Sequence, residues 1–170
     1  EALGLIDRLT PVGEDPRRTK RVRYEVRDPF LRLWLAVVVP NREAFELGRG
    51  ASVLAAVRDQ VAASHHHAFA AVVRDWLAER EQATCGPWWP TAAGDGVDVL
   101  ALRGAHAVAA ASVFWATGVD GQAERSQLRK VLEACPHARA DTLHVVARSG
   151  SQVTDPASLY DDCHGTSSKT

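Results

Sequence analysis

Residues 97–115, VDVLALRGAHAVAAASVFW, contain two apolar runs on either side of Gly104. The runs extend from Val97 to Leu102 and from Val108 to Trp115, and both contain β-branched valines. Nearly continuous apolar runs of this length are typical of strands that are buried on both faces of a sheet. A glycine between two such runs favours a turn. This segment therefore predicts two central strands.

Helical patterns flank the two predicted strands. Asp28 is a good N-cap and Pro29 suits the first position of a helix, which Pro40-Asn41 would end. Further helices are expected at 51–61, 67–81 and 123–135, and a third strand at 143–147. The apolar spacing within these helices predicts buried stripes, with Trp34 and Trp76 in the core. The stripe on the 67–81 helix consists of Phe69, Val72, Val73, Trp76 and Leu77.

This order of elements predicts an α/β fold with mixed pairing in its sheet. Residues 84–96, rich in glycine and proline, are expected to form a loop. At the N-terminal end, 5–12 and 21–26 are expected to be strands joined by a polar turn. The residues before this hairpin read as the end of a helix. The hairpin would then be the wing of a winged-helix domain, of which this chain contains only the end of the recognition helix.

Composition limits the function classes. The chain has 170 residues, enough for one domain and a small attachment, and a formal net charge of −1. Bulk charge therefore does not predict a polyanion binder, and any nucleic-acid contact must use a local patch. Three dispersed cysteines predict neither a zinc site nor a disulfide framework. No apolar run is long enough for a membrane span, and a cytoplasmic location is expected.

Three motifs follow one another along the chain. They are Tyr24-x-Val26-x-Asp28-Pro29-Phe30-Leu31-Arg32-Leu33-Trp34 with Pro40-Asn41 after it, Trp88-Trp89 before Gly96-Val97-Asp98-Val99, and Leu143-His144-Val145-Val146-Ala147-Arg148-Ser149-Gly150. In order and spacing they resemble the C-terminal region of the archaeal-type ATPase family, the domain of unknown function 234. The resemblance covers the chain roughly from Leu3 to Gly150.

The resemblance implies a protein built from a P-loop ATPase, a winged helix and a restriction-endonuclease-like domain of the PD-(D/E)XK type. It divides this chain into the end of a winged helix at 1–27, a restriction-endonuclease-like domain with N-terminal helices at 28–160, and a disordered tail at 161–170. No P-loop motif occurs in the sequence. ATP and Mg²⁺ are therefore expected only for an upstream ATPase domain of the same protein, which would be the partner of this chain, with DNA as a further candidate partner.

A nuclease of this type needs a carboxylate from an early helix, an aspartate from one strand, and a Glu-x-Lys pair from the next strand. Aligned on the family pattern, the strand aspartate is Asp98. The other three positions carry Ala70, Ser112 and Phe114. Serine is a poor ligand for a hard cation, and alanine and phenylalanine offer neither a ligand nor a positive charge. The resemblance thus implies a degenerate nuclease, in which Asp98 is a relic and no metal is bound.

Other constellations leave alternatives open. Arg17, Arg18, Lys20, Arg21 and Arg23 form a basic run that could meet nucleic-acid phosphates or be a solvated turn. Asp98 could share a displaced metal with Asp95 and with Asp120 or Glu124. The His65-His66-His67 run invites a metal site, but consecutive helical residues point too far apart to bind one ion. The run is therefore expected to be the polar start of a helix. The Trp88-Trp89 pair could stack on bases, but the core is the favoured place for it.

The function predicted from the sequence is a non-catalytic C-terminal module of an ATPase, either regulatory or nucleic-acid-binding. A metal-dependent nuclease with displaced active-site residues is the first alternative. A protein-interaction module is the second.

Overall fold

The computed structural model describes residues 4–90, 96–137, 140–157 and 159. Its main sheet has four strands in the order β3-β4-β5-β7. They are Thr84–Trp88, Val97–Arg103, His106–Phe114 and Thr142–Ala147. Strand β4 is antiparallel to both of its neighbours, β3 and β5, and β7 runs parallel to β5. The predicted α/β class with a mixed sheet is therefore confirmed.

The β4–β5 hairpin forms as the sequence predicts. Gly104 lies in the turn with a φ of 65°, a conformation that favours glycine. Val99, Ala109 and Ala111 are completely buried on one face of the sheet, and Leu100 and Ala110 on the other. The hairpin therefore lies at the centre of the protein.

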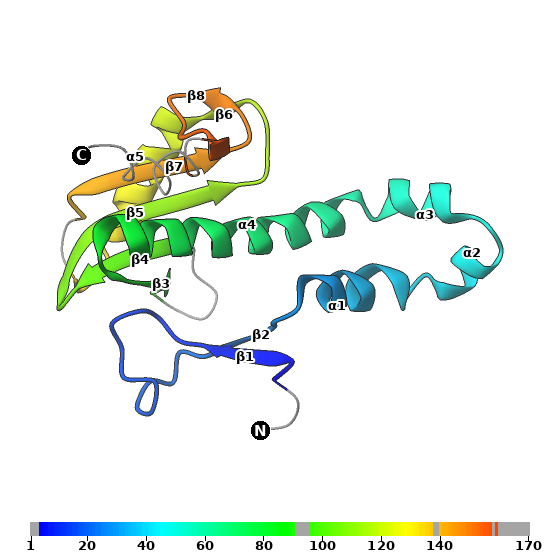
Figure 1. The fold of residues 1–170 in the computed structure, drawn as a ribbon, viewed down its shortest axis with the longest axis horizontal. Coiled ribbons are helices and arrows are strands. Elements are labelled where there is room, and N and C mark those ends of the chain that lie inside the picture. Colours follow the sequence, from blue (N-terminus) through cyan, green and yellow to red (C-terminus); the bar gives the residue numbers. More distant parts are fainter. Residues whose placement is uncertain (1–3, 91–95, 138–139, 158, 160–170) are drawn as a thin grey trace, which may run out of the picture.

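A helix covers each face of the sheet (Figure 1). Helix α4, Arg58–Glu81, packs Phe69, Val73, Trp76 and Leu77 against one face. Helix α5, Gly121–Leu132, lies on the other and links β5 to β7 as a crossover. Parallel strands require a connection of this kind.

Two predictions about α4 are wrong. The expected helices at 51–61 and 67–81 are instead α3, Gly50–Ala56, and one long α4. No glycine or proline interrupts 58–81, so nothing ends the helix before Gln82 adopts a left-handed conformation. The three histidines consequently lie within α4 rather than at its start. Val72 is 49% exposed, because the sheet covers only a narrow stripe of the helix.

The expected loop at 84–96 begins with strand β3, so that prediction is also wrong. Gly86 and Pro87 have poor strand propensity, but an edge strand tolerates proline. Trp88 and Trp89 are each only 1% exposed, which confirms their place in the core. The tail predicted to be disordered lies outside the described residues. A small parallel pair, β6 (Val119–Asp120) and β8 (Gly150–Ser151), was not predicted.

The N-terminal hairpin consists of β1, Ile6–Leu9, and β2, Arg23–Val26, which pair antiparallel as expected. The long connection between them returns to the main domain, where the backbone N–H of Val12 donates to the Pro87 carbonyl at 2.9 Å. The hairpin and edge strand β3 are thus directly joined.

A helical arm extends from the sheet domain (Figure 1). It contains α1 (Pro29–Leu33), the π-helical turn η1 (Trp34–Val38), α2 (Arg42–Glu46) and α3. Asp28 caps α1 by accepting from the Leu31 N–H at 2.8 Å, as predicted. Val37, Val53 and Val57 form a small core of its own.

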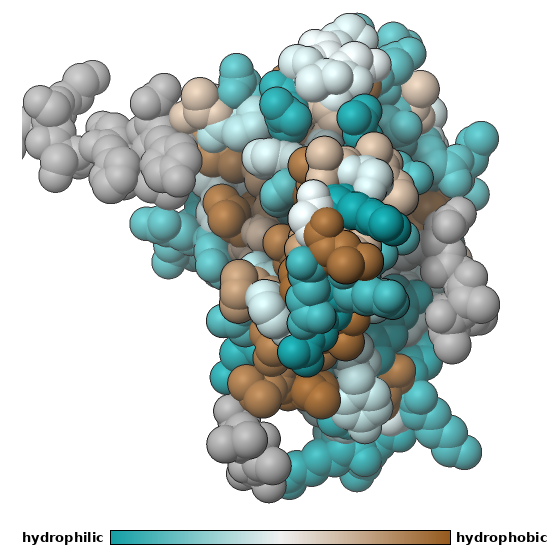
Figure 2. Space-filling model, turned by 90° about the vertical axis from the view of Figure 1, so that its right-hand side faces the viewer, coloured by the Kyte–Doolittle hydropathy of each residue, from teal (hydrophilic) through white to brown (hydrophobic). Residues whose placement is uncertain are grey.

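Trp34 is 44% exposed, so its predicted burial is wrong. The Val39 N–H bonds to the Trp34 carbonyl, five residues back, and this wider turn departs from the 3.6-residue spacing behind the prediction. Figure 2 shows hydrophobic side chains at this end of the molecule. The exposed apolar residues of the arm are Phe30, Trp34, Leu35, Val39, Phe45, Leu47 and Leu54.

The two helical tryptophans should therefore differ in their contribution to stability. We expect Trp76→Ala to lower the free energy of unfolding by roughly 3–5 kcal/mol, because it empties a buried site next to the sheet. Trp34→Ala should cost less than half as much, because much of its ring is already in water. Urea unfolding followed by circular dichroism measures both. Equal losses would mean that Trp34 packs against a core after all.

Candidate functional site

The four positions expected from the nuclease pattern meet at one end of the sheet. Asp98 borders two neighbouring cavities, of about 470 and 210 Å³. Ser112 and Phe114 of β5 line the larger, which we call the strand cavity. Ala70 of α4 lines the smaller, which we call the hairpin cavity because β1 and β2 border it. Residues far apart in sequence are thus brought together around Asp98.

The Asp98 carboxylate is held by two neighbours. The backbone N–H of Val113 donates to Oδ2 at 2.8 Å, and His66 Nε2 lies 3.4 Å from Oδ1. The hydrogen bond with Asp98 raises the pKa of His66 above its ordinary value, against the opposing effect of burial. A histidine from the helix therefore faces the aspartate from the strand.

A second histidine–carboxylate contact lies beside the first. His67 Nδ1 is 3.7 Å from Oε1 of Glu25 on β2, and Arg32 approaches the same carboxylate at 3.5 Å. Burial lowers the pKa of His67, so its neutral form is favoured. These contacts connect the N-terminal hairpin to α4 next to the Asp98 site.

The arrangement is poorly suited to a divalent metal. Within the described part of the chain, no group of three or more histidine, cysteine, aspartate or glutamate side chains is placed to hold a metal ion. Glu124 does line the strand cavity together with Asp98. Asp120 instead caps α5 by accepting from the N–H groups of Gln122 and Ala123. Asp95, another candidate ligand, lies outside the described residues.

Sequence reasoning named Ala70 but missed His66 and Arg74, the other residues of α4 in the site. His66, Ala70 and Arg74 all line the hairpin cavity. Because their spacing of four residues puts them on one face of a helix, the pattern can be recognised only if 58–81 is taken as a single helix. The predicted helix start at His67 left His66 outside the helix.

The basic run divides into two groups. Arg17, Arg18 and Lys20 are exposed on the β1–β2 connection. Arg21 instead pairs with Glu14 and donates to the carbonyls of Trp89 and Pro90, at 2.7 and 3.0 Å. The Arg23 guanidinium lies over the Trp89 ring, 4.3 Å from its centroid. Two of the five cations thus attach the hairpin to the tryptophan pair.

The two cysteines that the structure describes are not disposed for nucleophilic chemistry. Burial raises the pKa of Cys85 to about 11 and also raises that of Cys135. Both thiols are free. They are therefore protonated at neutral pH.

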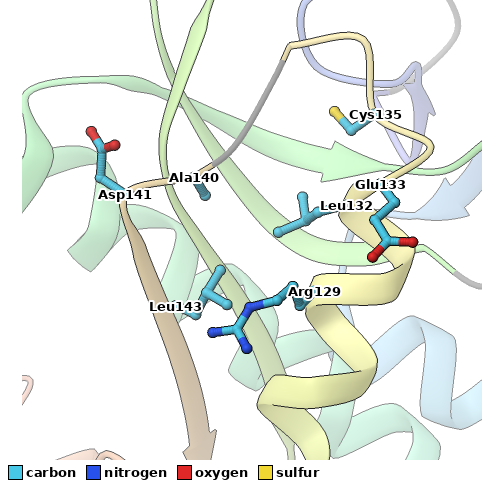
Figure 3. Close-up of a pocket in the computed structure, with 7 residues that line it drawn as sticks. All are labelled: Arg129, Leu132, Glu133, Cys135, Ala140, Asp141 and Leu143. Carbon is cyan, nitrogen blue, oxygen red and sulfur yellow. The ribbon is translucent and has the colours of Figure 1, made fainter.

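Figure 3 shows another cavity, of about 630 Å³, between the end of α5 and the start of β7. Leu132, Cys135 and Leu143 give it an apolar wall, and Glu133 and Asp141 lie at opposite ends of it. None of the residues predicted as a site from the sequence lines this cavity.

The fold and the Asp98 site define a mixed α/β protein with a histidine–carboxylate cluster at one end of its sheet. The chain belongs to domain of unknown function family 234, described as archaea bacterial proteins of unknown function, whose model matches residues 34–130. No curated protein and no solved structure matches the chain significantly. Among the helices that the structure describes, none is both long and apolar enough to cross a membrane.

The His66–Asp98 contact should make stability depend on pH. The pKa of His66 is raised in the folded state, so protonation of His66 stabilises the fold. This stabilisation is fully present below the unfolded pKa of 6.5 and is lost as the pH rises through the folded pKa. We therefore expect His66→Gln to lower the free energy of unfolding more at about pH 5.5 than at about pH 8.5.

Urea unfolding of the wild type and the variant at both pH values measures this difference. His106→Gln, at an exposed end of β5, is the matched control. A loss in the His66 variant that is the same at both pH values would exclude proton-linked stabilisation by this pair.

Proposed function

We propose that this chain is a non-catalytic module with a degenerate nuclease fold, which regulates an ATPase or binds nucleic acid for it. The observation that carries the proposal is the state of Asp98. Its carboxylate is engaged by His66 and by the Val113 N–H, and the neighbouring positions carry Ala70, Ser112 and Phe114. The order helix, three antiparallel strands, helix and parallel strand supports a restriction-endonuclease-like core.

The loss of catalysis follows from the chemistry of phosphodiester cleavage. The metals in such sites stabilise the attacking and leaving oxygens, and carboxylates hold them in place. Alanine and phenylalanine offer no oxygen, and a serine hydroxyl is a weak ligand for Mg²⁺. Removing even one electrostatic donor to a transition state typically costs about 10²–10³ in rate. Three such losses together leave no route to efficient cleavage.

The proposed division of the chain follows the family resemblance. Residues 1–27 would end a winged helix, 28–160 would form the nuclease-like domain, and 161–170 would be a tail. The ATPase domain would lie upstream in the same protein, in the cytoplasm, and would hold ATP and Mg²⁺. The β1–β2 hairpin is in keeping with a wing, although its connection also packs on the main domain through Val12.

Nucleic-acid binding is proposed to use the exposed part of this connection. Arg17, Arg18 and Lys20 can reach phosphates without burying a charge. Arg18 pairs with Asp15 at 3.5 Å, and its side chain remains 89% exposed. An exposed ion pair of this kind is weak enough to be exchanged for a phosphate contact.

A protein-interaction role is the second candidate, and the exposed apolar side chains of the helical arm favour it. Phe30 and Leu54 are 69% and 61% exposed. Clusters of exposed apolar residues are often binding surfaces. The DNA-binding measurement below separates this candidate from the first.

The first test concerns catalysis. We expect no cleavage of plasmid, single-stranded DNA or RNA in the presence of Mg²⁺ or Mn²⁺, because Ala70, Ser112 and Phe114 occupy the positions where such a nuclease needs its other ligands and its lysine. Gel electrophoresis after incubation with the purified protein measures this. Cleavage that is lost in both Asp98→Ala and Glu124→Ala would contradict the proposal and establish a nuclease with displaced ligands.

The second test concerns DNA binding. Replacing Arg17, Arg18 and Lys20 with alanine should flatten the slope of log affinity against log salt by ~2–3, since each phosphate contact contributes about −0.9 on duplex DNA. Fluorescence anisotropy with a short 5′-hydroxyl duplex at several salt concentrations gives the slope.

A triple alanine variant of Arg42, Arg49 and Arg58 is the matched control, because it removes the same charge from exposed positions on the arm and on the first turn of α4. It should keep the wild-type slope. Equal slopes in the wild type and the hairpin variant would exclude phosphate contacts by Arg17, Arg18 and Lys20. No binding even at low salt would favour the protein-interaction role.

A further inference from the structure

The hairpin cavity has an unusual lining. Arg74 and Trp89 both border it, and each has a buried side-chain N–H with no hydrogen-bond acceptor among the described residues. These atoms are Nε of Arg74 and Nε1 of Trp89. A buried donor without an acceptor costs about 1–3 kcal/mol in a folded protein, so such groups are rare and call for a partner.

The chemistry of these two side chains restricts what the partner can be. An indole N–H and a guanidinium donate hydrogen bonds but cannot accept them. A matching ligand must therefore offer hydrogen-bond acceptors to both, and the charge of Arg74 favours an anion. Arginine pairs especially well with phosphate, through two parallel hydrogen bonds. The Arg23 guanidinium, stacked over the Trp89 ring, adds a second positive charge to the same cavity.

Two carboxylates also line the cavity, Asp98 and Glu25, and both are engaged. Asp98 contacts His66, whose raised pKa favours the charged form, while Glu25 lies 3.5 Å from Arg32. Their charges are therefore partly offset, and the charge of Arg74 remains to attract an anion. The size of the cavity gives a further limit. At about 210 Å³ it lies below the roughly 300–1,000 Å³ of sites that enclose whole drug-sized ligands, so it suits a single small group.

We propose that the hairpin cavity is a binding site for one phosphate group, held by Arg74 and the indole N–H of Trp89. The phosphate is either free orthophosphate or the terminal phosphate of a nucleic-acid strand. In the second case the site adds recognition of a strand end to the proposed function. Binding orthophosphate itself does not depend on that proposal.

Isothermal titration of the whole chain with orthophosphate, at about pH 7.5 and constant ionic strength, tests the site. We expect a single site that Arg74→Gln weakens at least tenfold, about the effect of losing one charge-assisted hydrogen bond. Arg74→Lys keeps the charge but loses the planar set of donors, and should fall between the two. Trp89→Phe, confirmed as folded by circular dichroism, should also weaken binding.

Arg58→Gln is the matched control, because it makes the same change on the same helix at an exposed position outside the cavity. It should bind orthophosphate like the wild type. Absence of orthophosphate binding, tighter binding of acetate, or equal affinity in the Arg74 and Arg58 variants would each overturn the proposal.

Competition identifies the source of the phosphate. An oligonucleotide with a 5′-phosphate that displaces orthophosphate, when the same oligonucleotide with a 5′-hydroxyl does not, supports the site as one for strand ends. Orthophosphate binding that neither oligonucleotide affects supports it as a site for the free anion. Both readouts are independent of the salt slope measured with the 5′-hydroxyl duplex, so this site and the hairpin surface can fail separately.

Discussion

Strands β4 and β5 pair antiparallel at the centre of the sheet, and side chains from both are buried on each face. This pairing positions every other part of the main domain. It gives α4 an apolar surface on one side and α5 a surface on the other, and it leaves β3 and β7 to complete the two edges. Because both faces are covered, small residues such as Ala109, Ala110 and Ala111 allow the layers to approach closely.

The same pairing generates the site. Asp98 follows the first residue of β4, beside the last residues of β5, so its carboxylate reaches the Val113 N–H at the end of the sheet. A residue in this position is accessible from two sides, which is why it borders both the strand cavity and the hairpin cavity. The chemistry of the two cavities differs. One places Ser112 and Phe114 beside Asp98, whereas the other combines arginines with an unpaired indole donor.

The N-terminal part of the chain is attached through specific polar contacts. Arg21 links it to the carbonyls after β3, and Glu25 links it to His67. The helical arm is different, because its own core contains only a few valines and several large apolar side chains remain in water. An arm of this composition has fewer buried contacts than the sheet domain, so local opening is expected to be easier there.

The sequence by itself determined the central hairpin, the turn at Gly104, the crossover helix, the last strand and the Asp28 cap. Each of these follows from a local pattern of apolar residues or from the conformational preference of one residue. The family resemblance singled out Asp98, Ala70, Ser112 and Phe114, and the fold places these residues around two neighbouring cavities.

Only the tertiary structure decided the features that depend on distant partners. Strand β3 forms despite Gly86 and Pro87 because β4 supplies its hydrogen bonds. Trp34 is exposed because no second layer among the described residues covers that face of the arm. The pairing of His66 with Asp98 joins residues on different elements, and the inward turn of Arg21 needs the carbonyls that follow β3. Local periodicity carries no information about such contacts, since it records which residues are apolar and not what the chain folds against.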